Sequence, residues 1–156
     1  MKIALLNPPH RAIGSRVPGE LLPPFGLLAI GGPLIDAGHA VRLVNADLQP
    51  MEDAQIVAAL LDDPPDAVLL GHSGSTSAHP VVARLGPLIR AALPGVRIVY
   101  GGVYPSYHWE TVLRDCPDID VIVRGEGEET APRLMAALAT GASLETVPGI
   151  AFRRGG

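Results

Sequence analysis

Five short aliphatic runs alternate with segments of helical spacing along the chain, and this alternation most constrains the fold. Each run is continuously apolar, which predicts β-strands buried on both faces of a sheet. The predicted strands are Ile3–Leu6, Val41–Val44, Ala67–Leu70, Val96–Tyr100 and Ile119–Val123. A regular succession of strands and helices predicts a parallel sheet with helices on both faces and right-handed connections. We therefore expect an α/β, Rossmann-like, doubly wound five-stranded parallel sheet in the flavodoxin-like order 2-1-3-4-5, with a Rossmann-type order as the alternative.

The segments between the predicted strands contain helix stop signals. Apolar residues at helical spacing from Leu27 to Ile35 end before Gly38, and the last helical segment ends at Gly141. The other predicted helices are Ala54–Leu61, Pro80–Leu93, Tyr107–Arg114 and Glu128–Ala139. After Gly141 the pattern predicts a turn and a short strand over Ser143 to Phe152. We therefore assign residues 1–142 to one domain and residues 143–156 to a linker toward a further domain absent from this sequence.

The composition limits the classes of function. The chain has 156 residues, of which 47% are hydrophobic, enough for one domain with a sizeable core. It has 12 Lys and Arg residues against 16 Asp and Glu residues, which argues against a nucleic-acid partner. The single cysteine, Cys116, excludes a disulfide framework and a metal site built from several cysteines of this chain. No signal peptide is recognisable, and the longest uncharged stretch, Leu21 to Ile35, is too short to span a bilayer; we expect a cytoplasmic protein without a transmembrane segment.

Hydroxyl-bearing residues follow the third predicted strand. In an open parallel sheet, ligands bind beyond the carboxyl ends of the strands. Ser73, Ser75 and Thr76 lie there, just before a predicted helix. Small hydroxyls and free backbone N–H groups at a helix start suit a phosphate or a polar nucleotide tail. The alternative is ordinary capping of the helix by one hydroxyl.

Glycines and aromatic residues follow the fourth and fifth predicted strands. Gly101 and Gly102 permit close approach of a ligand to the backbone, although a tight turn would use them as well. The Tyr104–Trp109 stretch holds three of the six aromatic residues and either supports a large flat ligand or packs a helix. The Gly125–Glu128 segment lacks the spacing of a phosphate loop. Its glutamates suit amide or hydroxyl donors, or else the positive end of a helix.

The familiar small α/β proteins do not fit these strand ends. A phospho-receiver domain needs acidic residues after its first and third strands, where this chain has Asn7-Pro8-Pro9 and Gly71-His72. A flavodoxin needs a phosphate loop after its first strand, and the two prolines remove N–H donors there. The glycine fingerprint of dinucleotide-binding folds is absent from that position.

Five motifs spread over the chain form a joint pattern. They are Asn7-Pro8-Pro9, Pro23-Pro24-Phe25-Gly26-Leu27-Leu28, Gly38-His39-Ala40-Val41, Gly101-Gly102-Val103-Tyr104-Pro105 and Arg124-Gly125-Glu126-Gly127-Glu128. Together they resemble the N-terminal cobalamin (B12)-binding domain of B12-dependent radical SAM enzymes. The resemblance implies cobalamin as the cofactor of this chain. It also implies a full-length parent protein that holds a 4Fe-4S cluster and S-adenosylmethionine.

Three further stretches resemble a narrower group within that family. They are residues 7–16, 31–36 and 71–80. They are similar to the anaerobic oxidative cyclases of bacteriochlorophyll synthesis, which act on Mg-protoporphyrin IX monomethyl ester. The resemblance implies radical chemistry that closes the isocyclic ring, with the Mg-porphyrin substrate bound by the parent enzyme.

Two departures from the family pattern shape the expectation. The cluster motif Cys-x3-Cys-x2-Cys is absent, because Cys116 is the only cysteine, so we expect no catalytic residue in this chain. The Asp-x-His-x-x-Gly motif of methyltransferase-type cobalamin domains is also absent, and His10 has the wrong spacing and no acid to orient it. We therefore expect no histidine ligand to cobalt, with the nucleotide tail detached and buried near the serine-rich loop.

The predicted cofactor-binding residues come from the loops after four strands. They are Pro9, His10, Ser73, Ser75, Thr76, Gly101, Gly102, Val103, Tyr104, Gly125, Glu126 and Gly127. The resemblance implies that the loops after the third and fourth strands border the nucleotide tail and that those after the first and fifth flank the corrin. The alternative function is a tetrapyrrole-sensing or protein-interaction module without catalysis, with the Tyr104–Trp109 stretch as its contact.

Overall fold

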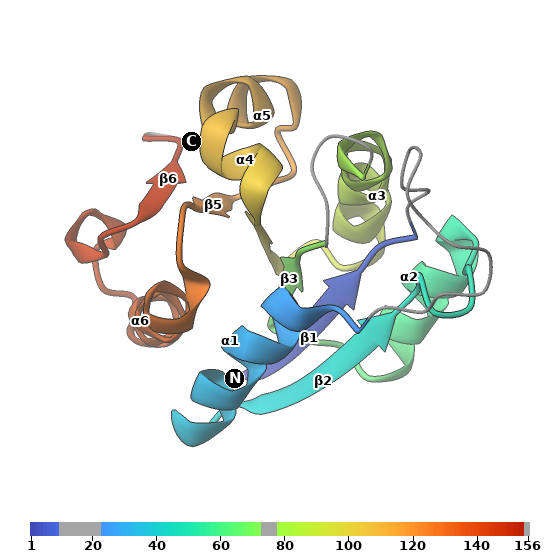
Figure 1. Cartoon of the computed structure of the whole chain (residues 1–156), viewed down its shortest axis with the longest axis horizontal. Helices are drawn as coiled ribbons and strands as arrows, with labels where there is room; N and C mark the ends of the chain where they lie inside the picture. Colours follow the sequence, from blue (N-terminus) through green and yellow to red (C-terminus); the bar gives the residue numbers. More distant parts are fainter. Residues whose placement is uncertain (10–22, 73–77, 155–156) are drawn as a thin grey trace.

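The protein folds around one mixed sheet, and the computed structural model describes residues 1–9, 23–72 and 78–154 (Figure 1). The strand order is β2-β1-β3-β4-β5-β6. The parallel strands are β1 (Lys2–Asn7), β2 (Ala40–Asn45), β3 (Ala67–Leu70), β4 (Arg97–Gly101) and β5 (Val121–Val123). β6 (Ile150–Phe152) is antiparallel to β5. The doubly wound α/β fold and the order 2-1-3-4-5 of the parallel strands are confirmed.

The predicted count of five strands is wrong, because β6 extends the sheet beyond β5. Phe152 pairs with Val121, and Ile150 pairs with Val123. The backbone N–H of Arg124 donates to the carbonyl oxygen of Gly149 at 2.8 Å, which begins this pairing. A strand of three residues has no periodicity that shows its partner, so the sequence predicts the short strand without placing it in the sheet.

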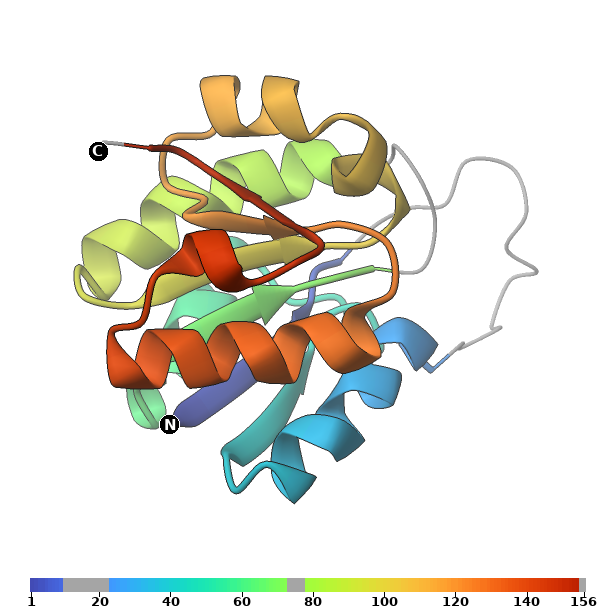
Figure 2. The ribbon, with the colours of Figure 1, turned by 90° about the vertical axis from the view of Figure 1, so that its left-hand side faces the viewer.

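The helices cover both faces of the sheet, as Figures 1 and 2 show. On one face lie α1 (Phe25–Asp36) and α6 (Gly127–Thr140), which contact each other. On the other lie α2 (Asp53–Asp62), α3 (His79–Ala92), α4 (Val103–Tyr107) and α5 (Trp109–Asp115). A 3-10 helix, η1 (Leu144–Thr146), connects α6 to β6. Each face has its own buried cluster: Leu34, Leu134 and Met135 pack on the first, and Ile56, Leu85 and Val112 pack on the second.

The predicted helix Tyr107–Arg114 corresponds to α5, which begins at Trp109. A separate short helix, α4, precedes it, and the sequence analysis does not predict that helix. The expectation that both faces of the second strand are buried is wrong. β2 is an edge strand of the sheet, and Leu43 is 40% exposed. The other helix predictions agree with α1, α2, α3 and α6 to within a few residues.

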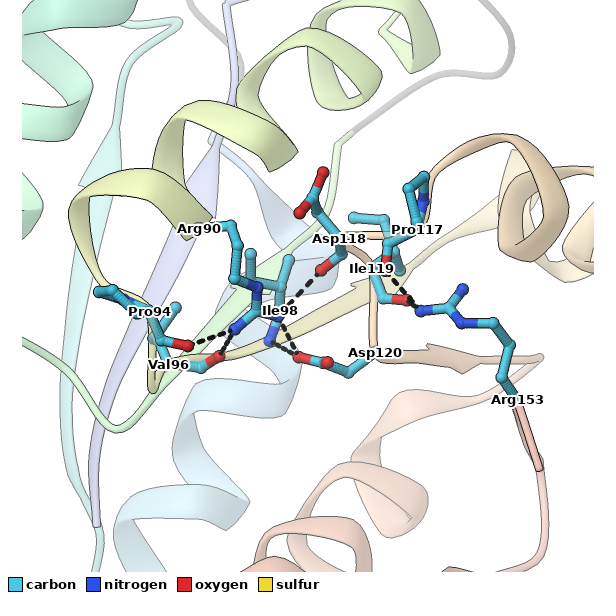
Figure 3. Close-up of polar contacts among 9 residues, drawn as sticks. All are labelled: Arg90, Pro94, Val96, Ile98, Pro117, Asp118, Ile119, Asp120 and Arg153. Atoms are coloured by element: carbon cyan, nitrogen blue, oxygen red, sulfur yellow. Dashed lines mark hydrogen bonds and ion pairs between the residues drawn. The ribbon is translucent and has the colours of Figure 1, made fainter. Parts of the chain in front are cut away.

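Two arginines connect the elements at the amino ends of β4 and β5 (Figure 3). The Arg90 guanidinium donates to the carbonyl oxygen of Val96 at 2.6 Å and to Asp120 Oδ2 at 2.8 Å. Asp120 Oδ2 also accepts from the backbone N–H of Ile98 at 2.7 Å. Arg153, just after β6, donates to three carbonyl oxygens of the α5–β5 connection, those of Leu113, Pro117 and Ile119. These bonds fix the amino edge of the sheet, opposite the strand ends discussed next.

Candidate functional site

A cavity of about 180 Å³ lies at the carboxyl edge of the sheet, on the face covered by α1 and α6. Its walls are apolar side chains and glycine backbone from four places in the sequence. They are Pro24, Gly26, Leu27 and Ile30 of the α1 region; Leu69, Leu70, Gly71 and His72 from β3; Val99, Gly101, Gly102 and Val123 from β4 and β5; and Gly125, Glu126, Gly127, Glu128 and Ala131 of the α6 region. An apolar cavity with few polar groups at a strand-end crevice is typical of a small-molecule or cofactor site.

Gly102 has a backbone conformation that only glycine adopts readily. Its φ is +113° and its ψ is −174°. A Cβ atom added there would have His72 O as its nearest neighbour, at 3.9 Å, which is an ordinary van der Waals distance. Backbone conformation, and not a steric clash, therefore requires glycine at this position of the cavity lining.

The loop between β5 and α6 also lines the cavity, next to the loop that follows β4. Gly125 has a φ of +74°, in the left-handed region that favours glycine. Glu126 precedes the first turn of α6, and Glu128 lies within that turn. Carboxylates at a helix N-terminus are stabilised by the helix dipole and remain available as hydrogen-bond acceptors.

A stack of histidine and tyrosine rings lies at the same edge of the sheet as the cavity, but on the face covered by α3 and α5. His72 Nε2 is 3.0 Å from Tyr100 Oη, and Tyr100 is fully buried. The Tyr104 ring lies between His79, at a centroid distance of 4.4 Å, and His108, at 4.5 Å. Burial raises the pKa of the Tyr100 phenol and lowers the pKa of the His79 imidazole. The Tyr104 ring is therefore engaged in packing within this stack.

The structure brings five of the predicted site residues to one cavity. They are Gly101, Gly102, Gly125, Glu126 and Gly127. Val103 is 58% exposed on α4, outside the cavity lining, and Tyr104 belongs to the ring stack. Pro9 is half-buried beyond β1 and does not line the cavity either. The predictions for His10, Ser73, Ser75 and Thr76 lie outside the described residues.

The sequence reasoning did not identify the contribution of α1 to the cavity. Leu27 and Ile30 of α1 form part of its wall, and so does Ala131 of α6. The available signal was the apolar character of α1, which carries no charge before Asp36, since a helix that is apolar on all sides needs more than one apolar neighbour. That signal shows that the helix packs on something, and only the tertiary structure shows that a cavity is part of its surroundings.

Residues 1–9, 23–72 and 78–154 contain no cluster of three or more His, Cys, Asp or Glu side chains suited to hold a metal ion. They also contain no helix long and apolar enough to cross a membrane.

Comparison with known proteins identifies the family. A family model described as the B12 binding domain matches residues 11–135. The chain belongs to the B12-binding domain family. This domain is 56% identical over 154 residues to the anaerobic magnesium-protoporphyrin IX monomethyl ester cyclase of Synechocystis sp., covering 99% of this chain and 31% of that protein. It is 32% identical to the hopanoid C-3 methylase of Methylococcus capsulatus, covering 83% of this chain and 25% of that protein.

Solved structures share the fold of this B12-binding domain. The radical S-adenosylmethionine methyltransferase TsrM from Kitasatospora setae superposes with a TM-score of 0.79 at 17% identity, over 99% of this chain and 28% of that one. The cobalamin-dependent S-adenosylmethionine radical enzyme OxsB, with aqua-cobalamin bound, gives 0.77 at 23% identity, over 97% of this chain and 20% of that one. The chain thus spans about a third or less of the length of these relatives.

Proposed function

We propose that this chain binds cobalamin at the carboxyl edge of its sheet and serves as the cofactor-binding domain of an anaerobic Mg-protoporphyrin IX monomethyl ester cyclase. The observation that carries the proposal is the glycine-lined apolar cavity at that edge, in a chain that belongs to the B12-binding domain family. The cyclase assignment is supported by the 56% identity to the Synechocystis cyclase over nearly the whole chain.

The cavity fits the nucleotide tail of cobalamin. The tail ends in a flat aromatic heterocycle, which gains free energy from apolar walls such as Leu27, Ile30 and Val123. Gly101 and Gly102 leave the backbone free of side chains on the path into the cavity. Ser73, Ser75 and Thr76 follow β3 in the sequence, and we propose that their hydroxyls bind the polar part of the same tail.

The corrin ring then lies outside the cavity, over the rim of the sheet. Its edge carries amide side chains, whose N–H groups need acceptors. The Glu126 and Glu128 carboxylates beside the cavity mouth supply them. In this proposal Pro9 and His10 border the ring, Val103 and Tyr104 belong to the loop region after β4 that borders the nucleotide tail, and no histidine of this chain is assigned to the cobalt.

The bound cobalamin supplies cobalt-centred redox chemistry to the reaction, and this chain holds it in place. The chain has one cysteine, Cys116, which is buried, and burial raises the pKa of its thiol. A 4Fe-4S cluster needs several cysteine thiolates. We therefore assign the cluster, S-adenosylmethionine and the Mg-porphyrin substrate to another part of the parent enzyme. Residues 143–156, of which β6 belongs to the sheet, lead toward that part in this proposal.

The test is a binding experiment with hydroxocobalamin. The purified chain is mixed with hydroxocobalamin and passed over a sizing column, with the visible spectrum recorded across the protein peak. The proposal expects a coloured species that co-elutes with the protein and has a shifted spectrum. Free elution of all the hydroxocobalamin, with the protein folded by circular dichroism, would contradict it.

The same column distinguishes the alternative of a tetrapyrrole sensor. Tyr107 is 82% exposed and Val103 is 58% exposed on neighbouring turns of α4, which gives the rim an apolar surface suited to a flat ligand. A Mg-porphyrin is therefore run in parallel. Retention of the porphyrin with no retention of hydroxocobalamin would favour the sensor, and the reverse result supports the cobalamin domain.

A further inference from the structure

The side chain of Ser106 connects the loops that follow the neighbouring strands β4 and β5, both of which line the cavity. Its hydroxyl donates to the carbonyl oxygen of Gly102 at 2.7 Å. The hydroxyl oxygen of Ser106, Oγ, accepts a hydrogen bond from the backbone N–H of Gly125 at 3.0 Å. One hydroxyl thus bridges the β4–α4 loop and the β5–α6 loop, and Figure 1 shows α4 beside β5 where this contact forms.

The bond from Ser106 to Gly102 alone would be ordinary. Serine and threonine in helices commonly donate to the carbonyl oxygen four residues earlier. Thr140 does so at the end of α6, where its hydroxyl donates to the carbonyl oxygen of Ala136 at 2.9 Å. Ser106 differs from Thr140 because it also accepts a hydrogen bond from a separate loop, 19 residues further along the chain.

Both ends of the bridge are glycines, and the Gly102 carbonyl oxygen also accepts the backbone N–H of Ser106 at 3.2 Å. Gly102 and Gly125 have positive φ values, and both line the cavity. Glycine loses more conformational freedom on ordering than any other residue, so a loop that relies on glycine gains most from a bond that fixes it. The neighbouring Arg124 is held from the other side, by the carbonyl oxygen of Gly149 at 2.8 Å.

We propose that Ser106 is a positioning residue, which sets the separation of the two glycine loops and so preorganises the cavity mouth for the corrinoid. This inference rests on the proposed cobalamin function and adds to it a residue that need not touch the ligand. A loop fixed before binding loses less conformational entropy when the ligand arrives, and affinity rises accordingly. Without the hydroxyl, each binding event has to order both loops.

The experiment compares Ser106→Ala with Ser106→Thr and Thr140→Ala, using hydroxocobalamin as the probe in equilibrium titrations of the full chain. Ser106→Ala is expected to weaken binding about tenfold. Ser106→Thr keeps the hydroxyl and restores most of the affinity. Thr140→Ala removes a hydroxyl with the same helix bond, away from the cavity, and leaves the affinity unchanged.

A second readout needs no ligand. Hydrogen exchange of the Gly125 amide, followed by NMR in the ligand-free protein, is expected to accelerate in Ser106→Ala and to remain slow in Ser106→Thr. If Ser106 only stabilised the fold, Ser106→Ala would lower the unfolding midpoint, and the exchange rate of the Gly125 amide would change no more than the rates of other exposed amides.

The outcomes separate the two proposals. If the unaltered protein does not bind hydroxocobalamin, the proposed function fails, and the Gly125 exchange still reports whether the bridge orders the loops. If the unaltered protein binds and Ser106→Ala binds equally well, the positioning role of Ser106 is overturned. Equal Gly125 exchange in all variants overturns it as well.

Discussion

The two edges of the sheet are built from different kinds of residue. At the amino edge, Arg90 and Arg153 reach across several connections and bond to backbone carbonyl oxygens and to the Asp120 carboxylate. At the carboxyl edge, β4 and β5 are followed by Gly102 and Gly125, which line the cavity. One edge is crossed by hydrogen bonds from long side chains, and the other presents glycine backbone and an apolar cavity.

This contrast shows how the molecule separates stability from binding. Long side chains at the amino edge satisfy backbone carbonyls that would otherwise be left without a partner, which stabilises the folded state. Glycines at the carboxyl edge contribute little to stability, but they leave room for a ligand and expose backbone groups to it. We therefore expect substitutions at the carboxyl edge to change affinity and substitutions at the amino edge to change the free energy of unfolding.

The largest expected effect is at Gly102. In Gly102→Val, a β-branched residue cannot keep a φ of +113°, so the loop has to leave its present path. We expect hydroxocobalamin affinity to fall at least ~100-fold in the equilibrium titration. The matched control is Gly95→Val, at the amino side of β4, where an added Cβ meets no atom within 4 Å. If Gly102→Val and Gly95→Val lost hydroxocobalamin affinity equally, the claim that binding depends on the carboxyl edge and not on the amino edge would be wrong.

An intermediate effect is expected at Arg90. Arg90→Ala leaves Asp120 and the carbonyl oxygen of Val96 without their guanidinium partner in a half-buried site. The free energy of unfolding, measured in urea, should fall by about 2 kcal/mol. Arg84→Ala is the control, because its ion pair with Asp53 is more exposed and should contribute about 0.5 kcal/mol or less. Hydroxocobalamin affinity should change little in either variant, and a tenfold change in Arg90→Ala would show that the edges are coupled.

The smallest effect is a dependence of stability on pH, with one histidine at each edge. Burial lowers the pKa of His79 below 6.5. The groups that face its imidazole are Tyr100, Tyr104, His108 and Asp115. His108 lowers the pKa further, and Asp115 raises it. The unfolded chain therefore binds more protons near pH 6, and stability falls as the pH falls through 6.5 toward the folded-state pKa.

Replacing His79 tests this dependence. In His79→Phe, the loss of unfolding free energy between about pH 7.5 and about pH 5.5 should shrink by less than ~1 kcal/mol. His39, at the amino end of β2, also has a lowered pKa, caused by burial and by the chain's amino terminus. His39→Phe, a substitution at the amino edge, should therefore also reduce the dependence of the unfolding free energy on pH. A steeper slope in either variant would contradict the assigned direction.

Much of the fold could be predicted because it depends on local patterns. Continuous aliphatic runs gave the parallel strands, and Gly38 and Gly141 marked helix ends. The short helix α4 was missed because it has only five residues and contains Pro105, so the segment after Gly101 and Gly102 looks like a loop in the sequence. The exposure of Leu43 was missed because an apolar run looks the same at an edge as in the centre of a sheet.

The candidate site was predictable in part, for the same reason. Gly101, Gly102 and the Gly125–Gly127 segment stand out in the sequence, because glycines after strands mark places where the backbone must turn or approach a ligand. The predictions made for Val103 and Tyr104 depended on the direction of side chains, which packing decides. Tyr104 packs between His79 and His108, outside the cavity lining.

The sequence by itself determined the alternation of strands and helices and the glycine-rich loops at the carboxyl ends of the strands. These features follow from residue spacing and from backbone preferences, which act over a few neighbouring residues. Only the tertiary structure decided that α1 and α6 enclose a cavity beside those loops, that β6 joins the sheet, and that Ser106 bridges Gly102 and Gly125. Each of these depends on contacts between segments that are distant in the sequence, and such contacts leave no local pattern.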